Sequence, residues 1–277
     1  MTKLDPSLVP GAVFDNAELA RIFGCGTQGG MRRAHKTNSL VLVSNHVESI
    51  YDDRWIDGVL HYTGMGTEGN QSLNFLQNKT LNESLQTNVA VFLFEVFKAQ
   101  EYTYIGPVIL AGKPYQETQQ DKNKLDRLVW VFPLQLTAGK PVTISDKTAA
   151  DLLNKKLKAA RRLDDDELRR RAFHRSGQSG QRSVSVSQYD RNPWVAEYTK
   201  RRADGHCDLC HEPAPFPGKD GTPYLENHHI TWLSRGGEDS VLNTVALCPN
   251  CHRRMHVLDG DADKALLLKR IKMREAN

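Results

Sequence analysis

Four of the five cysteines occur in two pairs with the spacing of metal-binding turns. Cys207 and Cys210 form the first C-x-x-C pair, and Cys248 and Cys251 form the second. Four thiolates complete the tetrahedral shell that Zn²⁺ adopts in structural sites, and a redox dithiol or a coincidence of spacing is the alternative. The spacing therefore predicts a structural zinc site that has no open position for a substrate.

Histidines between the two pairs and directly after the second pair could serve a second metal. Residues 225–230 are typical of a short strand and contain the adjacent His228 and His229. Neighbouring strand residues point to opposite sides, so the two imidazoles should have different surroundings. His252 and His256 are four residues apart in a predicted helix and share one face. We expect His228 to face a divalent cation beside them, and His229 to stay free to act on water.

This constellation resembles the HNH endonucleases of the ββα-metal class. The stretch from Tyr189 to His256 is most similar to the McrA-type subgroup of bacterial restriction enzymes. The resemblance implies that His228 and His252 are metal ligands, that His229 is the general base, and that Asn243 braces the loop that orients this base. His256 matches the third ligand of the three-histidine variants, with a place just outside the ligand shell as the alternative. The sequence departs from the family pattern at the polar Asn227 and at Thr231-Trp232, where a proline-containing turn is usual.

The chemistry implied by the resemblance is hydrolysis of a phosphodiester. A catalytic divalent metal (Mg²⁺, Mn²⁺, Co²⁺ or Ni²⁺) would offset the charge that develops on the phosphate and on the leaving oxygen. A histidine with an ordinary pKa of about 6.5 suits the removal of a proton from water near neutral pH. Members of this family leave 5′-phosphate and 3′-hydroxyl ends, and we expect the same ends here.

A second motif lies near the amino terminus, in residues 52–66 (DDRWIDGVLHYTGMG). It resembles the SRA (YDG) domain, which flips a modified cytosine out of duplex DNA, and residues 9–14, 29–31 and 39–44 support the match in their order along the chain. The resemblance implies that Asp53 accepts a hydrogen bond from the cytosine amino group and that Tyr62 stacks on the ring, with Tyr51 or Trp55 as a second wall. Core packing is the alternative for Tyr62 and Trp55. Turn formation is the alternative for Asp53 and the other acids, Asp52 and Asp57.

Several cations could contact the DNA backbone. Arg32, Arg33 and Lys36 follow a glycine-rich stretch, and a basic loop of this kind could bind phosphates. A second group of cations lies on the helices predicted between about residues 145 and 173, for the first of which Asp146 is the expected N-cap. A solvated surface is the alternative in both places.

These observations define the organisation that we expect. The fold class is α+β, with an SRA-like curved β-sheet or barrel domain over residues 1–140. A helical, basic linker over 141–188 includes the flexible composition of Ser176 to Gln181, and an HNH endonuclease domain with its zinc site occupies 189–277. Strands are predicted at 39–44, 89–94, 102–105 and 129–132, and a short helix at 78–86.

Length and composition limit the function classes. The chain has 277 residues, a net charge of +4 and a hydrophobic fraction of 39%, values typical of a globular protein that could bind nucleic acid. Its start has no apolar signal core and its longest apolar run is far shorter than the ~20 residues of a membrane span, so we expect a cytoplasmic protein without a membrane partner. The resemblance to bacterial restriction enzymes implies that the protein is prokaryotic.

The resulting hypothesis is a modification-dependent restriction endonuclease that acts on double-stranded DNA carrying 5-methylcytosine or 5-hydroxymethylcytosine, such as phage DNA. One HNH site per chain suggests a homodimer, or two sequential nicks. Two rival hypotheses remain open from the sequence. One is a reader of modified DNA that does not cut, and the other is an HNH nuclease that acts on unmodified DNA.

Overall fold

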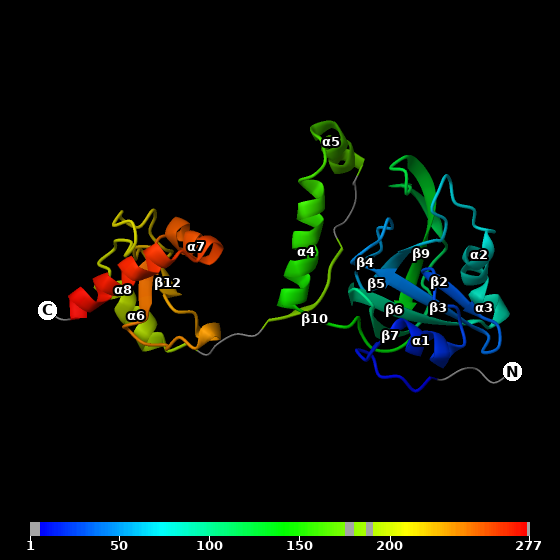
Figure 1. Cartoon of the computed structure of the whole chain (residues 1–277), viewed down its shortest axis with the longest axis horizontal. Helices are drawn as coiled ribbons and strands as arrows, with labels where there is room; N and C mark the ends of the chain where they lie inside the picture. Colours follow the sequence, from blue (N-terminus) through cyan, green and yellow to red (C-terminus); the bar gives the residue numbers. More distant parts are fainter. Residues whose placement is uncertain (1–5, 175–179, 187–190, 276–277) are drawn as a thin grey trace. The chain divides into compact units, whose positions relative to one another are not determined.

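The structure, a computed structural model, describes residues 6–174, 180–186 and 191–275. The chain divides into two compact units, Met1–Val186 and Ser187–Asn277 (Figure 1). Tyr189 and residues 176–179 of the predicted linker lie outside the described residues.

A nine-stranded sheet forms the centre of the first unit, within the described part of the chain. Its main path runs β2-β3-β6-β7-β9-β5-β4, with β1 paired to β7 and β8 paired to β9. The pair β3–β6 is parallel, and the other pairs in this sheet are antiparallel. Together with the helices described below, this sheet confirms the predicted α+β class and the four predicted strands. The bounds are β1 Val13–Phe14, β2 Met31–Ala34, β3 Ser39–Asn45, β4 Arg54–Ile56, β5 Val59–Thr63, β6 Ala90–Lys98, β7 Glu101–Leu110, β8 Tyr115–Gln120 and β9 Asp126–Leu136.

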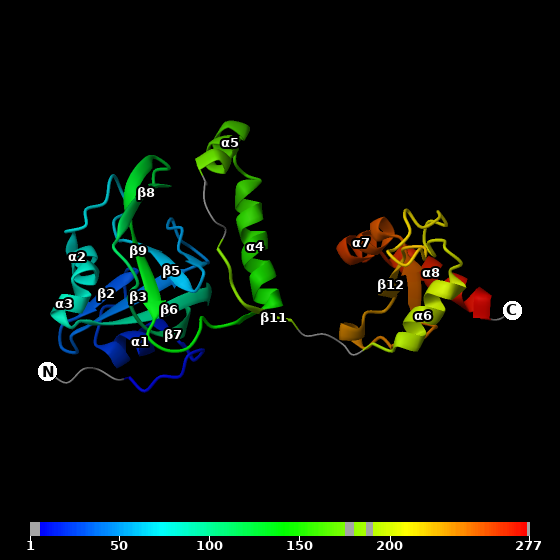
Figure 2. The same ribbon diagram turned by 180° about the vertical axis from the view of Figure 1, so that it is seen from behind.

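Both faces of the central strands are buried, which explains their continuous apolar sequences. Leu40 and Leu42 of β3 belong to one hydrophobic cluster, whereas Val41 and Val43 belong to another. Helix α1 (Asn16–Phe23) covers the second cluster with Leu19 and Phe23. Helices α2 (Leu76–Asn82) and α3 (Ser84–Thr87) lie beside β2 in both views (Figure 1, Figure 2). The helix predicted at 78–86 is therefore two short helices.

The two helices predicted after the sheet are confirmed as α4 (Asp146–Ala160) and α5 (Asp165–His174), and both belong to the first unit. The N-cap prediction for α4 was wrong by one residue. The hydroxyl of Ser145 accepts the amide N–H of Thr148 at 3.1 Å, while Asp146 is the first helical residue, where its negative charge favours the helix dipole. Strand β10 (Ile144–Ser145) before α4 pairs in parallel with β11 (Val184–Ser185).

A buried ion pair fastens the segment before β11 to the sheet. Glu95 of β6 is fully buried, and Arg182 donates to its two carboxylate oxygens at 2.6 and 3.1 Å. The indole N–H of Trp55 donates to the same carboxylate at 3.1 Å, and a ring nitrogen of His46 lies 2.7 Å from it. Burial raises the pKa of Glu95, but the hydrogen bonds from His46 and Arg182 outweigh this effect and lower it to about 2.

The second unit is a small ββα arrangement with two further helices. Strands β12 (Glu226–His229) and β13 (Thr244–Leu247) pair antiparallel, with His228 opposite Val245 and His229 opposite Thr244. Helix α7 (Pro249–Leu258) follows β13 directly, because Cys248 is its N-cap and Pro249 occupies its first turn. Helices α6 (Pro193–Arg202) and α8 (Asp261–Glu275) and the short 3₁₀ helix η1 (Leu233–Arg235) complete the unit.

Within the described ranges, no helix combines the length and the apolar character that a membrane crossing requires.

Replacement of Arg182 by Ala should destabilise the first unit. The change leaves the buried Glu95 carboxylate without its main cation, so we expect the free energy of unfolding at pH 7 to fall by about 3 kcal/mol. Because the folded-state pKa of Glu95 is lowered, its contribution is present above about pH 4.5 and is lost as the pH falls toward 2. Denaturant unfolding of wild type, Arg182→Ala, Glu95→Gln and the double variant measures this. Strictly additive losses in the double variant would contradict the coupling.

Candidate active site and nucleic-acid pocket

Three imidazoles meet between the hairpin and α7 in the second unit. His228 lies on β12, and His252 and His256 lie one turn apart on α7. One ring nitrogen from each residue lies within 4.8 Å of the others, the distance at which a single cation can be shared. The ring centroids of His228 are 5.3 Å from His252 and 5.0 Å from His256. The structure thus brings together all three histidines that the spacing placed at the second metal.

The nitrogen atoms of this cluster fit a divalent cation. The Nε2 atom of His228 is buried and has no hydrogen-bond partner within the described residues. The Nε2 atoms of His252 and His256 face each other at 3.0 Å, so a cation between them would satisfy both lone pairs. Burial, followed by the nearby His256 and His252, lowers the pKa of His228 to about 4 and keeps this ring neutral. Neutral imidazoles suit first-row transition metals in particular.

Two neighbours of the cluster were not found by the sequence analysis. The carboxylate of Glu226, at the start of β12, forms an ion pair with Nδ1 of His252. The ring of Trp232 lies 5.0 Å from that of His256, between centroids. A carboxylate on the outer nitrogen of a metal-binding histidine fixes the tautomer and orientation of the ring. Glu226 and His228 are two residues apart in the predicted strand and therefore point to the same side. This alternation was the only signal for Glu226 in the sequence.

His229 has separate surroundings, as expected for strand neighbours. Its Nε2 atom lies 2.9 Å from Oδ1 of Asp239, and only 8% of its side chain is exposed. The other carboxylate oxygen of Asp239 accepts the backbone N–H of Asn192, the N-cap of α6, at 2.5 Å. The hydrogen bonds from Asn192 and then His229 hold the pKa of Asp239 below its usual value, so this carboxylate is ionised. A sequence pattern did not identify Asp239, because ten residues and a loop separate it from His229.

Asn243 closes the loop that follows β12. Its side-chain oxygen accepts the N–H of Thr231 at 2.8 Å, and its amide group donates to the carbonyls of Thr231 and Glu238 at 2.9 and 2.8 Å. The backbone of Asn243 also accepts the N–H of Ile230 at 2.8 Å. These four bonds fix the chain immediately after His229. Gly237 belongs to this closure, because an added Cβ would lie 2.0 Å from the carbonyl oxygen of Thr231.

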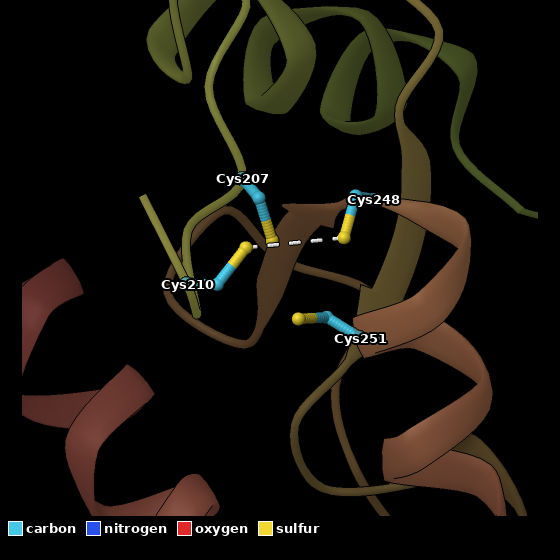
Figure 3. A group of neighbouring side chains, drawn as sticks. All are labelled: Cys207, Cys210, Cys248 and Cys251. Carbon is cyan, nitrogen blue, oxygen red and sulfur yellow. Dashed lines mark hydrogen bonds between the residues drawn. The ribbon is translucent and has the colours of Figure 1, made fainter. Parts of the chain in front are cut away.

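The four paired cysteines converge from two segments (Figure 3). Their sulfur atoms all lie within 4.8 Å of one another, and Sγ of Cys210 is 3.9 Å from Sγ of Cys248. Asp208, inside the first turn, is buried and accepts the N–H of Ala246 at 2.9 Å, so the first turn is held against β13. Burial and the neighbouring thiols raise the pKa of Cys251. Four thiols so close together could bind zinc, whose charge would stabilise them as thiolates.

A cavity of about 220 Å³ lies in the first unit beside the SRA-like motif. Tyr51, Asp52 and Asp53 line it together with residues 45–47, Ser49 and three residues of α4. Asp53 accepts the backbone N–H of Thr63 at 2.8 Å. Asp53 is partly buried where it lines the cavity. Burial therefore raises the pKa of Asp53 to about 6, and the Thr63 hydrogen bond opposes this only partly.

The structure does not bring the other predicted base-binding aromatics to this cavity. Tyr62 is 2% exposed, belongs to the hydrophobic core, and its hydroxyl donates to the carbonyl of Gly30 at 2.8 Å. Trp55 is 3% exposed and lies in the same core. The core-packing alternative describes both positions, whereas Tyr51 is half-buried at the cavity wall with its hydroxyl 3.1 Å from the carbonyl of Gly66.

The predicted backbone-binding cations also differ from one another. Arg32 and Arg33 lie on strand β2 and not on a loop. Arg32 is buried and donates to the side chain of Asn16 at 2.7 Å, and Arg33 donates to Asn38 and to two backbone carbonyls. Lys36, in the turn after β2, is exposed.

Two protein families match this chain, one in each unit. The HNH endonuclease family matches residues 207–257, which contain both cysteine pairs and the histidine cluster. The second unit thus carries an HNH endonuclease domain. The family described as "ScoMcrA-like, SRA domain" matches residues 10–156, more than half of the chain. The chain belongs to this family, and it combines an SRA domain with an HNH domain.

Individual relatives share parts of this arrangement. The "Type IV methyl-directed restriction enzyme EcoKMcrA" of Escherichia coli (strain K12) is 50% identical over 68 residues, which are 24% of each chain. The "Type IV phosphorothioation-dependent restriction endonuclease ScoMcrA" is 20% identical, with a TM-score of 0.41, over 97% of this chain and 61% of that one. The SUVH5 SRA domain in complex with hemi-methylated CG DNA is 24% identical, with a TM-score of 0.39, over 51% of this chain and 97% of that one. The match to EcoKMcrA spans about a quarter of the length of that curated relative.

Replacement of Glu226 by Gln should weaken metal binding at the histidine cluster. The variant lacks the Glu226 carboxylate that pairs with Nδ1 of His252 and orients this ring. Loss of such a group typically costs ~10- to 100-fold in metal affinity. Calorimetric titration with Ni²⁺, after the cysteine site has been filled with Zn²⁺, measures the effect. Glu197→Gln, which removes an exposed acid of α6, is the control. Equal affinities in the two variants would contradict a role for Glu226.

Replacement of Asp53 by Asn should stabilise the protein at alkaline pH. Because the folded-state pKa of Asp53 is raised, ionisation of this group lowers the free energy of unfolding as the pH rises from about 4 to about 6. Above about pH 6 this reduction stays constant. We expect Asp53→Asn to raise the free energy of unfolding by about 1–2 kcal/mol at pH 8 and little at pH 4. The full shift would correspond to roughly 3 kcal/mol, but part of the side chain faces the cavity. Urea unfolding at both pH values, with the exposed Asp57→Asn as control, tests this. No pH-dependent difference would refute it.

Proposed function

We propose that this protein is a modification-dependent DNA endonuclease. Residues 1–140 would form the reading domain, 141–188 the connection, and 189–277 the cutting domain. The observation that carries the proposal is the arrangement of four imidazoles in the HNH-type unit. Three of them have ring nitrogens within 4.8 Å of one another, and the fourth lies 2.9 Å from a carboxylate oxygen. A binding module would need the cysteine site but would have no use for this division of roles among the histidines.

His228, His252 and His256 would hold the catalytic divalent metal. When bound, such a cation offsets the negative charge that develops on the phosphate and the leaving oxygen of a phosphodiester. The four cysteines Cys207, Cys210, Cys248 and Cys251 would hold a structural zinc, so that the two cations have separate tasks. Any of Mg²⁺, Mn²⁺, Co²⁺ or Ni²⁺ is a candidate for the histidine site.

His229 would be the general base. Because the ionised Asp239 accepts a hydrogen bond from Nε2, the proton of the neutral ring resides on that atom and the lone pair resides on Nδ1. His229 would take a proton from the attacking water at Nδ1, and Asp239 would stabilise the imidazolium that results. Asn243 would keep the backbone after His229 in place, which supports the orientation of this ring.

The first unit would supply selectivity for a flipped, modified cytosine. The cavity beside Asp53 has room for about seven water molecules at ~30 Å³ each, and thus for a single-ring base. Asp53 would accept the hydrogen bond of the cytosine amino group, and Tyr51 would form one wall. Of the backbone cations predicted from the sequence, Lys36 retains the exposure that a phosphate contact requires, whereas Arg32 and Arg33 support strand β2.

We propose 5-methylcytosine or 5-hydroxymethylcytosine in double-stranded DNA as the ligand, a homodimer as the form that cuts both strands, and the bacterial cytoplasm as the place of action. EcoKMcrA is named a methyl-directed restriction enzyme, and the SUVH5 domain was solved with methylated DNA, so both names agree with this choice.

Cleavage of matched DNA tests the proposal. Plasmids with cytosine, 5-methylcytosine or 5-hydroxymethylcytosine are incubated with the zinc-loaded protein and each divalent metal, and cutting of a modified plasmid only is expected. His229→Ala should abolish cutting and leave zinc content and DNA affinity unchanged. No cutting with any metal would indicate a reader without nuclease activity, and equal cutting of all plasmids would indicate a nuclease that ignores modification.

Replacement of Asp239 by Asn should slow cleavage by roughly 10- to 100-fold in kcat, a share of the ~10²- to 10⁴-fold that general-base catalysis supplies. KM should change little, because Asp239 would act through His229 and not on DNA. Long-range ¹⁵N NMR of His229 gives a second readout, since the variant should lose the preference for the Nε2–H tautomer. Asp261→Asn, at a fully exposed position of α8, is the control. An unchanged tautomer and unchanged kcat would contradict the role of Asp239.

A further inference from the structure

Helix α4 stands beside the proposed base cavity without belonging to the core. It has 15 residues, and none of them is buried. Its apolar residues Leu153 and Leu157 are 58% and 43% exposed. A helix that packs so little contributes little to the stability of the sheet, so its position needs another explanation.

Three residues of α4 line the cavity, namely Lys155, Lys156 and Ala159. Lys155 and Ala159 are four residues apart and share one helix face, with Lys156 at its edge. Both lysine side chains are largely exposed, and Lys155 has its Nζ atom 3.9 Å from a carboxylate oxygen of Glu48, at the outer limit of an ion pair. A pair at that distance is weak and easily exchanged for a stronger anion.

The charges around the cavity are therefore divided. Asp52 and Asp53 line the cavity from the loop, and Lys155 and Lys156 line it from α4. A cytosine nucleotide has the complementary division, because its exocyclic amine is a hydrogen-bond donor and its phosphate is an anion. A basic helix face that only served solubility would not converge on the same cavity as Asp53.

We propose that Lys155 and Lys156 of α4 bind the DNA phosphate that flanks the flipped nucleotide, while its base occupies the cavity at Asp53. This inference rests on the proposed function and extends it, because it makes α4 one wall of the reading site. Contacts from lysine to phosphate are electrostatic and independent of sequence, so the helix would add affinity to every modified site and leave the choice of base to the opposite wall.

The test uses the full-length protein and duplex oligonucleotides with one 5-methylcytosine, measured by fluorescence anisotropy without divalent metal. The Lys155→Ala/Lys156→Ala variant should bind roughly 5- to 20-fold more weakly, with a salt slope reduced by about 2. The control Lys147→Ala/Arg161→Ala removes two cations of the same segment that do not line the cavity, and it should change affinity less than about 2-fold. Circular dichroism checks that α4 is intact. The Lys155→Gln/Lys156→Gln variant provides a second test in which the long side chains are kept and only the charges are removed.

A neutral methylphosphonate at the phosphates beside the modified cytosine separates this contact from general attraction. It should weaken wild-type binding by the same factor as the lysine replacements and leave the double variant almost unaffected. Equal weakening of both proteins, or equal losses in the lysine and control variants, would overturn the assignment of this phosphate to α4. Equal affinity of the wild type for modified and unmodified duplexes would instead refute the reading function, and the present inference with it.

Discussion

The second unit depends on one geometric constraint, the alternation of side chains along strand β12. Adjacent residues of a strand must face opposite ways, so His228 turns toward α7 and His229 turns toward Asp239. Pairing of β12 with β13 sets this register, and α7 starts directly after β13, which places His252 and His256 opposite His228. The cysteine turns bring the start of α7 and the turn at 207–210 together, and a cation bound by the four thiols would anchor the helix that carries His252 and His256.

The first unit carries a polar cavity beside a sheet whose central strands are buried. Its central strands are buried on both faces, so the polar residues that line the cavity come from the segment 45–53 and from α4. Arg182, in the segment before β11, forms an ion pair with Glu95 of β6. His46 lines the cavity and contacts the same carboxylate, so this ion pair also supports the cavity wall. The cavity wall therefore combines residues from the end of β3, the loop and α4, which are distant in sequence.

Local spacing was sufficient to predict the parts of the site that are set by one element. The two C-x-x-C turns, the pair His252 and His256 on one helix face, and the opposite directions of His228 and His229 follow from short-range geometry. The fold class and the strands followed from periodicity, since β-branched and aromatic runs were long enough to be distinctive. The HNH and SRA resemblances were confirmed by the matching families.

Sequence reasoning could not identify contacts that form only when separate elements pack. Glu226 meets His252 and Asp239 meets His229 through tertiary structure. Tyr62 was assigned to the base pocket by motif, but its hydroxyl is occupied by Gly30, a partner 32 residues away. The side chains of Arg32 and Arg33 likewise have partners inside the fold, and burial of this kind is not visible in charge patterning.

We propose that His228, His252 and His256 share one divalent cation and that His229 takes no part in binding it. Anomalous diffraction from crystals of the zinc-loaded protein soaked in Ni²⁺, recorded at the nickel edge, tests this most directly. We expect a single nickel peak bonded to nitrogen atoms of His228, His252 and His256 at about 2.0–2.2 Å, the usual metal–imidazole distance, with His229 still hydrogen-bonded to Asp239. A nickel ion bound by His229, or the absence of nickel from the three-histidine cluster, would contradict it.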